Sequence, residues 1–220
     1  MAQDNVINDK NAQTRTIGSF NAIKVSGSID IYLSQSGSEA LAVSASEDKF
    51  REKIRTEISN GTLKIWYEGD KISWSGNKKL RAYVSFKTLN MLEALGASNY
   101  HITGTLNVPT LNVRLTGASD MKGAVKISTL NINLSGASNV KLIGSAGIIN
   151  IDATGASDVK GYDLITDICS ATLTGASDVN ITINKELSAH ATGASSINYK
   201  GSAVVKDIHT SGASSISKKG

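Results

Sequence analysis

The sequence predicts an all-β protein: a right-handed parallel β-helix with coils of about 19 residues and an irregular N-terminal cap. Three observations point to this fold. A Gly-Ala-Ser triplet recurs seven times, alternating apolar and polar residues precede the copies, and the repeated region lacks helical periodicity. The triplets recur at intervals of 21, 19, 19, 20, 18 and 19 residues, which predicts one structural corner per coil. The corner glycines are Gly96, Gly117, Gly136, Gly155, Gly175, Gly193 and Gly212.

Each repeat contains strands that bury one face. Residues 111–116 read Leu-Asn-Val-Arg-Leu-Thr, and residues 130–135 read Leu-Asn-Ile-Asn-Leu-Ser. This alternation is typical of a strand with one apolar side. A unit of about 19 residues cannot bury that side alone, so successive units must stack with parallel strands about 4.8 Å apart. Equivalent residues should therefore form rows along the solenoid.

The rows assign roles to single residues. Cys169 falls in the inward row that begins with Leu111 and Leu130, so we expect it to be a small core residue rather than a reactive thiol. Within the triplet, glycine permits a positive φ or a close backbone approach. Alanine is expected to fill the inside of the turn, and serine to bond the backbone and the neighbouring coils.

The first 88 residues follow the repeat less closely and predict a terminal cap. We expect a flexible segment at 1–16 and a single β-helix domain at 17–217, with irregular coils and a cap at 17–88 and regular repeats at 89–217. Residues 20–38, 40–48 and 80–86 predict strands. Residues 46–58 allow one or two helical turns with Ser46 as N-cap, and Asn60-Gly61 predicts a hairpin turn.

Composition excludes several classes of protein. The formal net charge is +4 and no dense basic stripe is present, so a nucleic-acid partner is not expected. No apolar run approaches the roughly 20 residues of a membrane-spanning helix. The single cysteine permits no intramolecular disulfide. Residues 1–10 have neither the basic region nor the apolar region of a signal peptide.

The order of segments resembles a known family. Residues 18–38 (GSFNAIKVSGSIDIYLSQSGS), the segment NGTLKIWYE and residues 80–98 (LRAYVSFKTLNMLEALGAS) are followed by repeated Gly-Ala-Ser-Asp/Asn. This arrangement, over residues 17–217, is similar to the "putative auto-transporter adhesin, head GIN domain" family of bacterial envelope proteins, many of them from Bacteroidetes. The resemblance implies a right-handed parallel β-helix and export to the periplasm, the outer-membrane surface or the medium. It implies no catalytic residues.

Carboxylates are the first candidate site, because many parallel β-helices are polysaccharide lyases or hydrolases. Asp120, Asp158 and Asp178 share the position three residues after the corner glycine. Paired carboxylates can bind Ca²⁺ or act as general acid and base. However, lysines follow two residues after two of the aspartates, and Asn139 interrupts the row. We therefore expect a solvated, charge-balanced ladder and no metal site.

Histidines and aromatic residues are the other candidates. His190 and His209 occupy the same position in successive repeats, so their rings should lie about 5 Å apart. They could share a metal or titrate together, but the sequence offers no evident third ligand, and a surface ladder is the expectation. Trp66, Tyr67 and Trp74 flank a loop; they either pack on the cap or form a partner-binding surface that stacks on sugars.

The sequence therefore predicts a non-enzymatic, exported module that binds a glycan or surface protein and needs no cofactor. It contains no Gly-x-Ser-x-Gly elbow, phosphate loop, zinc-spaced Cys/His set or nucleotide fingerprint. Two alternatives stay open. One is a carbohydrate-active enzyme on the same scaffold. The other is a structural protein that forms homo-oligomers through the ends of the β-helix, where an unpaired edge would be exposed.

Overall fold

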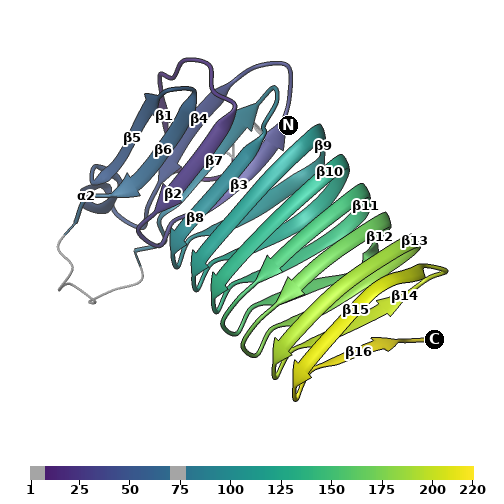
Figure 1. The fold of residues 1–220 in the computed structure, drawn as a ribbon. Coiled ribbons are helices and arrows are strands. Elements are labelled where there is room, and N and C mark those ends of the chain that lie inside the picture. Colours follow the sequence, from purple (N-terminus) through teal and green to yellow (C-terminus); the bar gives the residue numbers. More distant parts are fainter. Residues whose placement is uncertain (1–7, 70–77) are drawn as a thin grey trace.

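Five long strands wind around a common core and form the regular part of the molecule (Figure 1). The computed structural model describes residues 8–69 and 78–220. It confirms the predicted parallel β-solenoid with a spacing of about 19 residues: Leu130, for example, pairs in register with Leu111 on one side and Ile149 on the other. The long strands are β9 (Asn99–Gly117), β10 (Asp120–Gly136), β11 (Asn139–Ala153), β12 (Asp158–Leu173) and β13 (Asp178–Gly193).

Each long strand serves two sheet faces. On the first face the stack of long strands continues from β9 to β3, β7, β4 and β1, and on the second face it continues from β9 to β8, β2, β6 and β5. At the C-terminal end the two faces finish separately: β13 pairs with β14 on the first and with β15 on the second. These last strands are β14 (Ser196–Lys200), β15 (Val204–Gly212) and β16 (Ser215–Lys218).

The N-terminal cap closes the other end of the solenoid (Figure 1). It contains β1 (Gln13–Arg15), β2 (Ala22–Ser26), β3 (Asp30–Gln35), β4 (Ala40–Ser44), α2 (Asp48–Arg51), β5 (Ile54–Ser59), β6 (Thr62–Tyr67), β7 (Arg81–Phe86) and β8 (Met91–Gly96). Strands β4 and β7 pair antiparallel, as do β5 and β6. These antiparallel strands continue both sheet faces beyond the last parallel pair, so the parallel edge at this end of the solenoid is covered.

Details of the cap confirm two predictions and modify two others. Asn60 and Gly61 both have positive φ, at 50° and 73°, as a two-residue hairpin turn requires. The ranges predicted as strands, 20–38, 40–48 and 80–86, contain β2 and β3, β4, and β7 respectively. The short helix begins after Glu47, not Ser46. Residues 13–15 pair antiparallel with β4, so part of the segment expected to be flexible belongs to the sheet.

The core consists of the stacked inward rows. One row contains Leu111, Leu130, Ile149, Cys169 and Leu187, which are all buried. Cys169 thus has the predicted place, and its burial raises the pKa of its thiol to about 12. A thiol in this state has almost no thiolate at neutral pH, so Cys169 acts as a small apolar residue.

The Gly-Ala-Ser corners are built differently from the expected arrangement. The alanine points outward and is exposed, whereas the serine side chain is buried: Ser157 has no exposed surface. Its hydroxyl donates to the carbonyl of Thr154 at 3.0 Å, and the same bond recurs at other corners. The expectation that alanine fills the turn was wrong, because the alternation keeps its phase through the corner: Ser157 lies four residues after the buried Ala153 and two before the buried Val159, so the serine points inward and the alanine outward.

Candidate functional site

One face of the solenoid forms a continuous outer surface, which we call the long face. It consists of the strands in the order β5-β6-β2-β8, the second halves of β9 to β13, and β15. Each strand pairs in parallel with the next from β6 onward, so outward residues stand in straight rows. At about 4.8 Å per step, the nine steps from β5 to β15 extend over roughly 43 Å.

Three outward rows run along the long face. The first continues from Asn112 through Asn131 and Asn150 to Ser170, Ser188 and Asp207. The asparagine amides bond one another at 2.9 and 2.8 Å, which fixes their orientation. The second row consists of Lys64, Lys24, Glu93, Arg114, Asn133, Asp152, Thr172, His190 and His209. The third row consists of Trp66, Ser26, Leu95, Thr116, Ser135, Thr154, Thr174, Thr192 and Ser211.

Trp66 stands near the N-terminal end of this surface, on β6, the second of its strands. It is the register partner of Ser26 on β2, and its side chain is half-buried. The neighbouring row begins with charged residues, and the Lys24 ammonium lies 3.1 Å from the Glu93 carboxylate. The predicted aromatic residue therefore lies beside an ion pair and continues into a polar surface, an arrangement that sequence reasoning did not foresee.

Of the other two predicted aromatic residues, Tyr67 does not join Trp66 on this surface. Tyr67 is half-buried and packs against the core, and the Lys78 ammonium lies 4.8 Å from its ring centroid. Its main chain and Cβ press against the corner at Gly27, where any added Cβ would lie 2.9 Å from that of Tyr67. Tyr67 is therefore a packing residue of the cap. Trp74 lies outside the described residues.

The acidic row lies on the other sheet face. Asp120, Asn139, Asp158 and Asp178 are register partners in successive coils. The Asn139 amide donates to Asp120 at 2.8 Å, and Lys160 lies 3.6 Å from Asp158. The Asn139 amide donates to one carboxylate of the row and the Lys160 ammonium pairs with another, so this part of the row has the character of a polar, hydrogen-bonded ladder.

The two predicted histidines meet at the C-terminal end of the long face. Their ring centroids are 4.8 Å apart, close to the expected separation, and the rings are perpendicular. Asp207 lies between them: its carboxylate oxygens are 2.9 Å from Nε2 of His190 and 3.0 Å from Nε2 of His209. The sequence reading missed this third group, although the alternation Asp207-Ile208-His209 places both polar side chains on one face.

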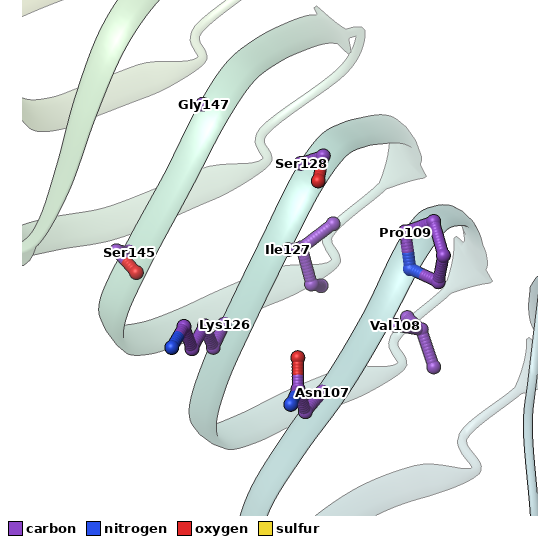
Figure 2. Close-up of a pocket in the computed structure, with 8 residues that line it drawn as sticks. All are labelled: Asn107, Val108, Pro109, Lys126, Ile127, Ser128, Ser145 and Gly147. Atoms are coloured by element: carbon purple, nitrogen blue, oxygen red, sulfur yellow. The ribbon is translucent and has the colours of Figure 1, made fainter.

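A shallow depression lies between β9, β10 and β11 (Figure 2). Its volume is about 420 Å³, and Asn107, Lys126 and Ser145 lie next to one another along its side. Gly147 has no side chain to fill it, and the buried residues Val108 and Ile127 lie beneath. Sequence reasoning singled out none of these residues. The depression has one charged lining residue, Lys126, and no converging acid and base.

In the described part of the chain, no helix is long and apolar enough to span a membrane. The search of curated proteins gave no match. Among solved structures, a "putative adhesin" from Bacteroides fragilis is similar to this chain with a TM-score of 0.83 and 25% identity, covering 96% of this chain and 98% of that one. A "putative adhesin" from Parabacteroides distasonis has a TM-score of 0.75 and 19% identity over 96% and 98%.

A third structure, a "putative lipid binding protein" from Parabacteroides distasonis, has a TM-score of 0.71 and 20% identity over 94% of this chain and 97% of that one. At 19% and 20% identity, the likeness to the two Parabacteroides distasonis structures concerns the fold alone. The family model described as "Putative auto-transporter adhesin, head GIN domain" matches residues 19–203, which is most of the chain. The chain therefore belongs to the auto-transporter adhesin, head GIN domain family, as its segment order and repeated corners indicated.

Proposed function

We propose that this protein is an exported, non-enzymatic recognition module of the cell envelope that binds a glycan or a surface protein through the long face. The observation that carries the proposal is the continuity of that face, from Trp66 near one end to the rows of asparagine, serine and threonine along its length. The family's description as an adhesin supports the same reading. Its auto-transporter label supports a location in the periplasm, on the outer-membrane surface or outside the cell.

The physical basis is preorganisation. The amides of Asn131 and Asn150 are held by their neighbours, so a ligand would not have to immobilise them. An indole such as that of Trp66 offers an apolar face beside these polar groups, and aromatic faces stack on apolar surfaces of sugars and side chains. An elongated ligand lying across the strands would contact equivalent groups in successive coils.

The test is a glycan array and an envelope-protein pull-down with the folded protein, repeated with W66A and N131A. Both variants should lose most of the binding, while retaining the far-UV circular dichroism of the wild type. The matched control is Y162A, which removes a half-buried aromatic residue that is not in the rows of the long face. Binding that survives W66A and N131A, or that is lost equally in Y162A, contradicts the proposal.

The enzymatic alternative has weaker support. A glycosidase needs one carboxyl group with a raised pKa beside an ionised one. Among the described residues, Asp9, Asp30, Glu39 and Asp207 have displaced carboxyl pKa values, and all four are lowered. Release of reducing ends or unsaturated products from a bound polysaccharide, abolished in D158N, would overturn the non-enzymatic proposal.

Self-association is a second candidate, favoured by the C-terminal end of the solenoid. Val205 and Ile208 are 39% and 40% exposed, although they continue rows that are buried in the preceding coil. A second copy of this chain that covered them would pair with the free edge of β15. Light scattering should then show a mass that rises with concentration, and I208K should remain a monomer. A wild-type monomer at every concentration excludes this candidate.

A further inference from the structure

The end of the long face holds three side chains that converge on one point. Strands β13 and β15 lie side by side there (Figure 1), and His190 pairs in register with His209. Asp207 precedes His209 by two residues on the same strand, so both side chains stand on the same outer side. One ring nitrogen from each histidine and a carboxylate oxygen of Asp207 all lie within 4.8 Å of one another.

The geometry is already arranged by the protein. The two oxygens of Asp207 each contact one imidazole, at 2.9 and 3.0 Å, so both Nε2 atoms face the same carboxylate. The two ring planes are perpendicular, and their centroids lie 4.8 Å apart. All three residues are exposed, so an ion could enter from solvent without opening the core.

We propose that His190, Asp207 and His209 form a binding site for a divalent transition-metal ion such as Zn²⁺. Two imidazole nitrogens with one carboxylate oxygen match the ligands that Zn²⁺ and its neighbours select, whereas Ca²⁺ and Mg²⁺ prefer sites made wholly of oxygen. Coordination uses the Nε2 lone pairs, so any Nε2 proton moves to solvent or gives way to the Nδ1 tautomer. The remaining coordination positions face solvent and are open to water or to a donor from a bound partner.

A metal ion at this site would cross-link the last coil to the coil before it. Its ligands come from β13 and β15, and β15 pairs with no other strand among the described residues. All nine residues of β15 are exposed, in contrast to the alternating burial of β13. A bound ion would join this terminal strand to the coil before it. Because the ion binds the folded state, it would also raise the thermal midpoint of unfolding.

The third histidine provides an internal control, since the chain contains only three. His101 lies on the other sheet face, 3.9 Å from Asp30, and its ring is 4.9 Å from that of Tyr32. Its side chain is 20% exposed and is not part of the His190–Asp207–His209 cluster. A metal that binds the proposed site should leave the side-chain resonances of His101 unchanged.

The experiment titrates the full chain, free of any histidine tag, with ZnCl₂ by calorimetry and by ¹H–¹⁵N spectra of the histidine side chains. We expect one ion per chain, with His190 and His209 shifted and His101 unaffected. H190A, D207N and H209A should each weaken binding at least about tenfold, since loss of even an indirect partner of a metal ligand costs that much. Hydrogen exchange in β15 should slow when Zn²⁺ is added.

Two control variants make the result decisive. D152N changes a carboxylate in the same row as His190 but two coils away, and H101Q removes the third histidine; both should bind Zn²⁺ as the wild type does. Absence of binding in the wild type overturns the proposal and leaves Asp207 as a hydrogen-bond partner of the two imidazoles. Binding that persists in H190A and H209A, or that shifts His101 equally, also overturns it. None of these outcomes depends on the ligand of the long face.

Discussion

The backbone N–H of Ala156 donates a hydrogen bond to the carbonyl of Gly136 in the preceding coil, at 2.7 Å. The same bond links Ala118 to Gly96 and Ala176 to Gly155, again at 2.7 Å, so one column of bonds joins the corners. The corner glycines have φ near +85°, and a Cβ added to Gly155 would overlap the carbonyl oxygen of Gly136. Glycine is thus required twice, by backbone conformation and by the closeness of the next coil.

Replacing Gly155 with alanine should test both requirements. We expect G155A to lower the free energy of unfolding by about 2–5 kcal/mol, the sum of the cost of a left-handed residue and of overpacking. The control is G96A, because Gly96 has φ of +78° but nothing within 4 Å of an added Cβ. It should lose only about 1–2 kcal/mol. Urea unfolding measures both, and equal losses would show that the close approach does not matter.

The buried serines should contribute to stability, whereas the neighbouring alanines should not. The Ser157 hydroxyl donates to Thr154 O at 3.0 Å from a fully buried position. S157A should therefore cost about 1 kcal/mol, the net value of a typical hydrogen bond. A156S changes the exposed member of the same triplet and should stay within about 0.5 kcal/mol of the wild type. If A156S lowered the thermal midpoint of unfolding more than S157A, the alanine rather than the serine would be the inward residue of the corner.

Cys169 should not react in the native protein. Its thiol is 1% exposed, and burial raises its pKa to about 12, so at pH 8 almost none of it is thiolate. Ellman's reagent should detect no thiol in the folded chain at pH 8 and one thiol per chain in denaturant. Rapid modification under native conditions would mean that the coil around residue 169 opens readily.

Asp207 should titrate below its ordinary range in the folded protein. The hydrogen bond from His190, together with the charges of His209 and His190, lowers its pKa from the usual 3.8. A lowered pKa in the folded state means that the contribution to stability is present above pH 3.8 and is lost as pH falls through the lowered pKa. Carboxyl ¹³C titration checks this, and the pKa should return toward 3.8 in H190A. An unchanged value in H190A contradicts the assignment.

The solenoid was predictable from the sequence because its information is local and repeated. A fixed interval between corners, combined with strict alternation, specifies which residues of each coil point inward, and hence the buried rows that contain Leu111, Leu130 and Cys169. The hairpin at Asn60-Gly61 followed from two residues that accept positive φ. Each of these features depends on chain neighbours or on equivalent positions one period away.

The candidate sites were only partly predictable, because they depend on strand register and on long-range pairing. The inward place of the corner serine follows from alternation that continues through the corner, from Ala153 to Ser157 and Val159, but sequence reasoning assigned that place to the alanine. Lys206 is an extra residue in the register between β13 and β15, and the spacing of the corner glycines gives no sign of this bulge. Trp66 joins the long face because β6 pairs with β2 across a separation of about 40 residues.

The sequence by itself therefore determined the period, the strands, the buried rows and the spacing of the two histidines. Only the tertiary structure decided that Asp207 lies between those histidines, that Trp66 lies near the start of the long face and that residues 13–15 pair with β4. The physical reason is that alternation and corner geometry are properties of a short stretch of chain. Which outward side chains meet depends on register between strands, and register is set by bulges, corners and antiparallel pairings that only the folded chain contains.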